Sequence, residues 1–153
     1  TPDEAAAAVA AFQNSLRELK AHDLEPNISV KLTMLGLDLS DEVALSNRRA
    51  ILQTAREVGG FVRIDMEGSD YVDGTLELYE RLHAAHSNTG ICLQAYLHRT
   101  AADIQRLLPQ NPGVRLVKGA YAEKATIAYQ KRPEIDAIRP IPVDAIAASS
   151  AAT

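Results

Sequence analysis

The sequence predicts an α/β fold in which parallel strands alternate with helices. Segments with apolar residues at helical spacing alternate with four strand-like segments, a rhythm typical of strand–helix–strand crossovers. The length of 153 residues suits a single domain. Hydrophobic residues make up 46% of the chain and charged residues 24%, which is the ordinary balance of a globular protein.

The first helix is predicted by its start signal. Thr1 can cap it, Pro2 occupies its first position and Glu4 completes a capping box. Four apolar residues then recur at helical spacing: Val9, Phe12, Leu16 and Leu19. A strand over 27–33 follows, in which apolar and polar residues alternate.

The second helix should begin after Ser40 and end at Gly59–Gly60, because glycine stops helices. Its adjacent arginines, Arg48 and Arg49, are expected on the solvated face of this helix.

The remaining elements repeat the rhythm, with strands predicted at 61–67, 90–97 and 114–120. Ser69 or Asp70 should cap the helix after the first of these strands. Thr100, with Asp103 three residues later, should open the helix after the second.

The end of the chain lacks this pattern. Three prolines between 133 and 142 precede an Ala- and Ser-rich stretch that could not bury one face. We therefore predict a folded domain over 1–137 and a low-complexity tail over 138–153, which we expect to be disordered.

Composition disfavours several classes of protein. The net charge of −4 and the lack of a basic cluster argue against nucleic-acid binding. A single cysteine, Cys92, excludes a disulfide framework and a thiolate metal site, and we expect it to be a small buried residue. No apolar run approaches the ~20 residues of a membrane-spanning helix, and no signal peptide opens the chain. Because the first residue is Thr rather than Met, we expect a piece of a longer protein.

The two faces of the strands predict where the chemistry lies. In a closed parallel barrel, alternate side chains face either the outer helices or the interior. One parity of the strand over 61–67 carries three charged residues, Arg63, Asp65 and Glu67. Burying these charges against apolar helices would cost much free energy, so the three side chains should face the interior near its mouth. The same argument selects one polar residue from each strand: Lys31, Asp65, Gln94 and Arg115.

These four residues allow two interpretations. They could form a salt-bridge network that only fixes the register of the strands. We favour a ligand site, because each strand contributes one residue toward its C-terminal end, where barrel enzymes bind their ligands. In the turn after the last strand, Gly119 and Ala120 would let a ligand approach the backbone, and Lys118 could meet a phosphate or a ring carbonyl. The histidines are expected at the surface, and no metal site is predicted: His22, His83, His86 and His98.

Four motifs resemble those of proline dehydrogenases, both the monofunctional bacterial enzymes and the matching domain of bifunctional proline-utilisation flavoproteins. They are ISVKLTMLGLDLS (28–40), FVRIDME (61–67), GICLQAYLHRT (90–100) and VRLVKGAY (114–121), and the resemblance extends over 1–137. It implies a partial (βα)8, TIM-like barrel with about four parallel strands and outer helices. It also implies FAD-dependent oxidation of L-proline to Δ1-pyrroline-5-carboxylate. The electrons would pass to a quinone, and the enzyme would be cytoplasmic or peripheral at the inner membrane.

The resemblance assigns a role to individual residues. Lys31 resembles the lysine near the substrate carboxylate, and Asp65 resembles the acidic residue that pairs with it and shapes the proline pocket. Arg115 resembles the arginine near the reactive nitrogen of the flavin. Tyr121 is expected near the substrate. The segments expected to contact the cofactor are Met66, Gln94, Val117, Lys118, Gly119 and Ala120.

Parts of the family pattern are missing, among them a first barrel strand and the paired arginines that clamp the proline carboxylate. We therefore expect a piece of the barrel, inactive alone and prone to self-association through open strand edges. Two other functions stay open: a non-catalytic barrel remnant, and a different TIM-barrel enzyme that contacts an anionic substrate through Lys31 and Arg115.

Overall fold

The computed structural model describes residues 1–136, in which helices and strands alternate as predicted. The predicted tail over 138–153 lies outside the described residues. The helices and strands are α1 (Pro2–Ala21), β1 (Asn27–Val30), α2 (Asp41–Glu57), β2 (Phe61–Ile64), α3 (Val72–His83), β3 (Thr89–Gln94), α4 (Thr100–Leu107), β4 (Gly113–Val117) and α5 (Arg132–Asp136). Short 3-10 turns lie at Thr33–Leu35, Ser69–Tyr71 and Leu108–Gln110.

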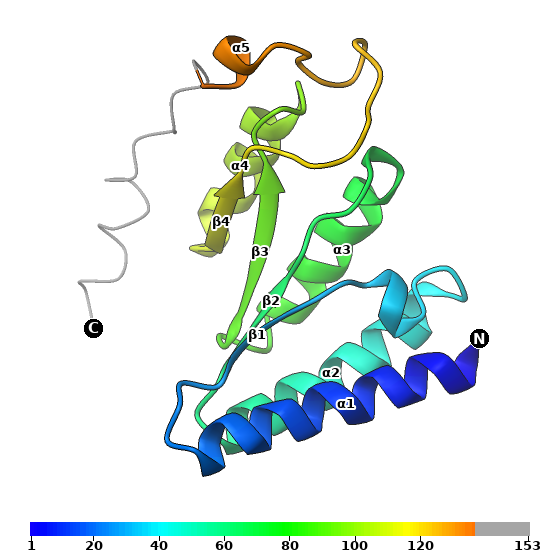
Figure 1. Ribbon diagram of the computed structural model, residues 1–153, viewed down its shortest axis with the longest axis vertical. Helices are drawn as coiled ribbons and strands as arrows, with labels where there is room; N and C mark the ends of the chain where they lie inside the picture. Colours follow the sequence, from blue (N-terminus) through cyan, green and yellow to red (C-terminus); the bar gives the residue numbers. More distant parts are fainter. Residues whose placement is uncertain (137–153) are drawn as a thin grey trace.

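The four strands form one parallel sheet in the order β1-β2-β3-β4. Three helices, α2, α3 and α4, each follow one strand and pack against one face of the sheet, and α1 lies alongside α2 (Figure 1). This arrangement confirms the α/β prediction and is that of a partial barrel. Within residues 1–136, β1 and β4 are the two edges of the sheet. None of the described helices combines the length and the apolar character that crossing a membrane requires.

The predicted helix starts are confirmed for α1 and α2. Thr1 and Glu4 form the capping box, and the Ser40 hydroxyl accepts a hydrogen bond from the backbone N–H of Val43 at 3.2 Å. Gly59 takes the left-handed backbone conformation after α2, with φ at +72°, as its predicted stop signal requires.

The predicted cap of α3 is wrong, and α4 begins at Thr100 as predicted but without the capping box. Ser69 lies in a 3-10 turn, and its N–H and hydroxyl both donate to the Glu123 carboxylate, so it does not cap α3. Helix α4 includes Thr100, whose hydroxyl donates to the backbone carbonyl of Gln94 at 2.5 Å. Asp103 instead pairs with Arg99, the residue before the helix. In both cases a tertiary or backbone contact takes the polar group that the local pattern assigned to a cap.

Every predicted strand extends about three residues too far at its C-terminal end. β2, for example, ends at Ile64 rather than at residue 67. The chain leaves the sheet there because Glu67 turns to the β1–α2 loop, where its carboxylate accepts hydrogen bonds from the Thr33 N–H at 3.2 Å and the Thr33 hydroxyl at 2.6 Å. Glu67 therefore ties together the two loops that follow β1 and β2.

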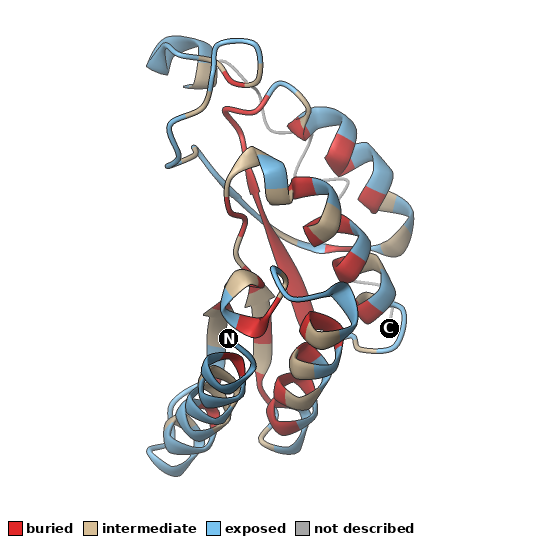
Figure 2. Ribbon diagram, turned by 90° about the vertical axis from the view of Figure 1, so that its right-hand side faces the viewer, coloured by how far each residue is buried: buried red, intermediate tan, exposed pale blue. Residues whose placement is uncertain are grey.

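The core lies between the sheet and the inner faces of the helices (Figure 2). One residue there contradicts the prediction: Arg48 is fully buried, whereas its neighbour Arg49 is exposed. Position 48 lies on the same helical face as Ala44 and Ile51, and its Nη2 donates to the Val62 carbonyl at 2.8 Å. Burial lowers the pKa of Arg48 to about 9.

Candidate functional site

The polar residues selected by strand parity meet on the face of the sheet opposite the helices. The Asp65 carboxylate forms an ion pair with the Arg115 guanidinium, and its other oxygen lies 3.9 Å from the Lys31 ammonium. Arg115 also donates to the Ser29 hydroxyl at 3.4 Å. The predicted convergence of Lys31, Asp65 and Arg115 is thus present in the structure: Lys31 and Asp65 directly follow β1 and β2, and Arg115 is the middle residue of β4.

Cys92 makes this arrangement possible. It lies on β3, between the strands that carry Asp65 and Arg115, and it is the register partner of Arg115. Its side chain is small and 4% exposed, so Arg115 can cross over β3 to reach Asp65. The pKa of Arg115 is raised, first by the Cys92 side chain and then by Asp65.

A layer of larger groups fills the same face nearer the N-terminal ends of the strands. The Phe61 ring lies over Gly90 and Gly113, where a Cβ would come within 2.8 Å and 3.3 Å of it, respectively. The Arg63 guanidinium stacks over this ring, 5.3 Å from its centroid. Arg63 therefore belongs to this inner layer rather than to the barrel mouth.

The ion cluster of Lys31, Asp65 and Arg115 is open to solvent. The side chains are 45%, 24% and 42% exposed, respectively. Solvent therefore screens the pair of Lys31 and Asp65, and Arg115 is the closer partner of Asp65. Two cations around one carboxylate leave a net positive charge, which suits an anionic group such as a substrate carboxylate.

Gln94 lies deeper, at the junction of two strand ends. It is 2% exposed, and its amide nitrogen donates to the Glu67 carbonyl at 2.8 Å. Its amide oxygen accepts from the backbone N–H of Ala120 at 3.4 Å. Gln94 thereby links the ends of β2, β3 and β4. Met66, next to Asp65 in sequence, is 5% exposed, and its side chain belongs to the core.

The segment after β4 turns away from the ion cluster. Lys118 forms an ion pair with Asp136 of α5. Gly119 has φ at +124°, and the Tyr96 ring occupies the space where a side chain would lie. The Tyr96 ring therefore closes the side of Gly119 on which a side chain would lie, and the approach of a ligand to the backbone of Gly119 and Ala120 stays a prediction.

A cavity of about 330 Å³ opens beside this segment, and Tyr121, which is 40% exposed, contributes to its wall. Neither Lys31 nor Asp65 lines this cavity, and Gln94 contacts the segment through the backbone N–H of Ala120. Other residues that line the cavity are Tyr96, Glu123 and Tyr129.

Sequence reasoning missed four residues that shape the site. Ser29 and Cys92 contact Arg115, and their parity in the strands, the same as that of Lys31 and Gln94, was a usable signal. Glu67 and Glu123 hold loops together by binding Thr33 and Ser69, respectively. No local sequence pattern predicts these distant partners. Among residues 1–136, no three His, Cys, Asp or Glu side chains are grouped closely enough to hold a metal ion.

The chain is similar to known proteins along most of its length. The sequence profile of the proline dehydrogenase family matches residues 1–140. Proline dehydrogenase 1 of Bacillus subtilis (strain 168) is 39% identical over 124 residues, which are 81% of this chain and 41% of that protein. Proline dehydrogenase of Deinococcus radiodurans is 37% identical over 121 residues, 76% of this chain and 39% of that protein.

Solved structures share the fold. The crystal structure of proline utilization A from Bdellovibrio bacteriovorus, inactivated by N-propargylglycine, superposes with a TM-score of 0.77 at 24% identity. The match covers 90% of this chain and 19% of that one. The chain spans about two fifths of the length of the curated relatives it matches.

Proposed function

Because the chain belongs to the proline dehydrogenase family, we propose that it supplies part of an FAD-dependent site that oxidises L-proline to Δ1-pyrroline-5-carboxylate. The observation that supports this most is the ion cluster of Lys31, Asp65 and Arg115. It stands at the C-terminal ends of parallel strands, where barrel enzymes bind substrate.

Each residue of the cluster has a separate task in the proposal. Lys31 binds the carboxylate of proline through its exposed ammonium group. Arg115 is the catalytic cation, placed beside the ring system that accepts the hydride. Asp65 is a positioning residue as well as the wall of the proline pocket, because it holds Lys31 and Arg115 through its two oxygens. The reaction breaks the C–H bond of the ring carbon beside nitrogen, forms a C=N bond and releases the amine proton.

The residues at the end of β4 fit a flavin cofactor. FAD would supply the two-electron acceptor that the oxidation needs. Arg115, Val117 and Lys118 are 42%, 37% and 55% exposed, and they offer two cations and an apolar surface for it.

The more buried candidates would contact the cofactor in limited ways. Gln94 keeps one amide proton beyond the bonds that it makes within the protein. Met66 could contribute only its backbone, since its side chain lies in the core. Gly119 and Ala120 would contribute backbone groups, and Tyr121 would approach the substrate from the neighbouring loop.

The electron acceptor of the complete enzyme in this proposal is a quinone, with the protein peripheral at the membrane. The family resemblance is the support for this part. Reduction of a water-soluble quinone analogue, with and without vesicles of anionic lipid, tests it.

A chimera tests the main proposal in a complete enzyme. The 124 matched residues of Bacillus subtilis proline dehydrogenase 1 are replaced by the matching residues of this chain. We expect a yellow protein that reduces a dye when proline is added. Bound flavin without proline turnover would favour the non-catalytic remnant. A colourless but folded chimera would favour a barrel enzyme of another kind, with Lys31 and Arg115 as anion contacts.

A further inference from the structure

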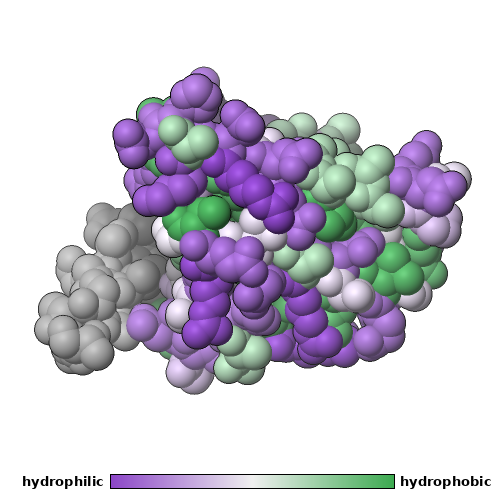
Figure 3. Space-filling view, turned by 90° about the horizontal axis from the view of Figure 1, so that it is seen from below, coloured by the Kyte–Doolittle hydropathy of each residue, from purple (hydrophilic) through white to green (hydrophobic). Residues whose placement is uncertain are grey.

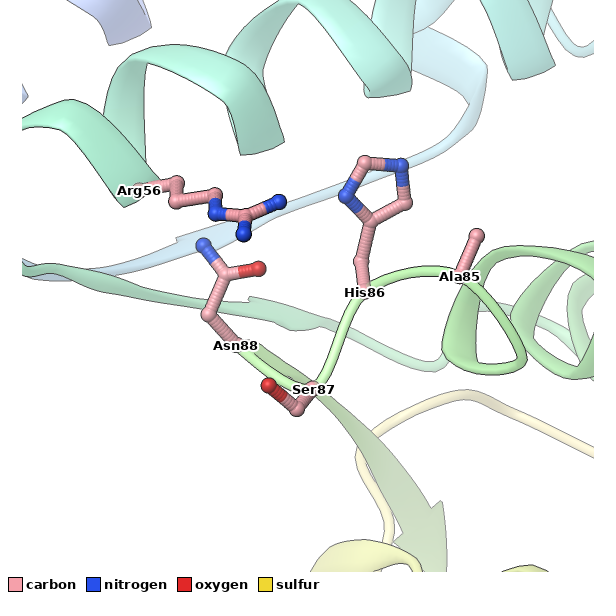
Figure 4. Close-up of a pocket in the computed structure, with 5 residues that line it drawn as sticks. All are labelled: Arg56, Ala85, His86, Ser87 and Asn88. Atoms are coloured by element: carbon pink, nitrogen blue, oxygen red, sulfur yellow. The ribbon is translucent and has the colours of Figure 1, made fainter.

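A second polar pocket lies at the opposite end of the sheet, near the N-terminal ends of the strands. It is formed by the end of α2 and the loop before β3, and we call it the basal pocket (Figure 4). Its volume is about 150 Å³, roughly five times the ~30 Å³ that a water molecule occupies in the liquid. The residues that line it are Arg56, Ala85, His86, Ser87 and Asn88.

Hydrogen-bond donors converge on the basal pocket. The Arg56 guanidinium and the His86 ring face each other, with the Asn88 side chain beside Arg56 (Figure 4). Asn88 is held in place, because its amide nitrogen donates to the Leu52 carbonyl at 3.2 Å and to the Gly60 carbonyl at 3.4 Å. The face of the molecule seen from below carries mostly hydrophilic side chains, with hydrophobic ones among them (Figure 3).

Among residues 1–136, no carboxylate lies within ion-pair distance of the arginine that lines the pocket, and the exposed carboxylate of Glu42 is influenced by the charge of Arg49 without forming an ion pair with it. Neither Arg56 nor Arg49, two turns earlier on the same stripe of α2, forms an ion pair with a described residue. The charged side chains that act on His86 are all arginines of α2: Arg49, Arg56 and Arg48. This local excess runs against the net charge of −4 for the whole chain.

A polar atom of a residue that lines the basal pocket lacks a partner within the described part of the chain: the buried Nδ1 atom of His86 makes no hydrogen bond. Arg48 of α2, which does not line the pocket, is fully buried, and its Nε and Nη1 atoms make no hydrogen bond either. Such atoms are rare in folded proteins and call for a partner that the protein itself does not provide.

We propose that the basal pocket binds a small divalent oxyanion of the size of sulfate or phosphate. Arg56, His86 and Ser87 are its ligands, and the buried charge of Arg48 strengthens the local potential. The volume excludes a drug-sized molecule, since pockets for those begin at about 300 Å³. The site is separate from the ion cluster of the proposed active site and lies at the other end of the strands.

Binding should be coupled to a proton on His86. Burial, followed by the charges of Arg49, Arg56 and Arg48, lowers the pKa of this histidine. A bound dianion reverses the sign of the local field and raises the pKa again. The bound form therefore takes up a proton, and affinity rises as the pH falls toward the lowered pKa of the free protein.

Arginine modification tests the site. The chain is treated with phenylglyoxal in sodium sulfate and in sodium chloride of equal ionic strength, and modified arginines are quantified by mass spectrometry. When sulfate is about nine times its Kd, modification of Arg56 should slow about tenfold by mass action. Arg17, exposed on α1, is the control and should react equally in both salts. Equal rates for Arg56 in the two salts, or equal slowing of Arg17, would overturn the proposal.

Histidine NMR gives a second, independent measurement. With ¹³C label in the imidazole rings, the pKa of His86 should be higher in sulfate than in chloride. Sulfate stays doubly charged throughout this pH range, so a shift in the His86 pKa cannot come from protonation of the anion. Arg56→Gln should abolish the shift and Arg17→Gln should preserve it. A His86 pKa that is the same in both salts rules out the site.

Discussion

Arg115 and Asp65 form an ion pair across an intervening strand. Arg115 belongs to β4 at the edge of the described sheet, and Asp65 follows β2, so the guanidinium passes over β3 to reach the carboxylate. The crossing point is Cys92, the register partner of Arg115. The size of the side chain at position 92 therefore determines whether the ion cluster can form.

Cys92→Leu should break this relationship. The larger side chain occupies the path of Arg115, and overpacking of a residue that is 4% exposed costs about 1–3 kcal/mol of unfolding free energy. In the chimera, proline turnover per flavin should fall with Cys92→Leu and should be kept with Cys92→Ala, which leaves the path free. Equal turnover in the two variants would show that Arg115 does not need this crossing.

Gly119 should tolerate no side chain. Its φ of +124° and the Tyr96 ring both oppose a Cβ, so Gly119→Ala should lower the free energy of unfolding by about 1–3 kcal/mol. Gly74 is the matched control, because it lies inside α3 and a Cβ added there would meet nothing within 4 Å. Gly74→Ala should raise stability by about 0.5–1 kcal/mol. Thermal unfolding tests this in the chimera: the unfolding midpoint should fall below that of the parent for Gly119→Ala and rise above it for Gly74→Ala.

His86 should make the protein sensitive to acid. Its folded-state pKa is lowered, so the unfolded chain binds a proton at this residue more readily than the folded chain does. The free energy of unfolding then decreases as the pH falls from about 6.5, the ordinary pKa of histidine, toward the lowered pKa of folded His86. Urea unfolding at pH 7.5 and pH 5.5, in chloride without sulfate or phosphate, should show a smaller loss for His86→Gln than for the parent. His22→Gln, on the exposed face of α1, serves as the control, and an identical loss in all three proteins would refute this role.

The alternation along each strand was enough to predict the side of the sheet that carries Lys31, Asp65, Gln94 and Arg115. Parity depends only on the two-residue period of a strand, which the sequence displays directly. The strand ends were not predictable in the same way. Glu67 leaves the sheet for Thr33, 34 residues away along the chain, and no local pattern reports such a partner.

Arg48 shows a second limit of the sequence. Two adjacent arginines resemble a solvated helix face, yet the helical period places position 48 on the same face as apolar Ala44 and Ile51. The helical period alone therefore predicts burial at position 48, against the charge of its side chain. At Gly119, the fold brings the Tyr96 ring to the place where a Cβ would lie, and no local pattern in the sequence reports that contact.

We expect the 153-residue chain, expressed alone, not to oxidise proline. The described sheet has unpaired edges at β1 and β4, and Leu116 and Val117 at the latter are 38% and 37% exposed. Open edges favour association with a second copy. Size-exclusion chromatography should show association, and the visible spectrum should show little bound flavin. A yellow, monomeric chain that reduces a dye with proline would contradict this expectation.

The central claim is that the ion cluster serves the substrate rather than the stability of the fold. Its side chains are 24–45% exposed, so removing Asp65 should cost only about 1 kcal/mol of unfolding free energy. The most direct measurement is proline turnover per bound flavin in the chimera with Asp65→Ala. We predict a fall of about 10- to 100-fold, the effect of losing a charged contact of about 1.5–3 kcal/mol, with flavin content nearly unchanged. Turnover equal to that of the parent, or flavin lost in proportion to turnover, would contradict the account.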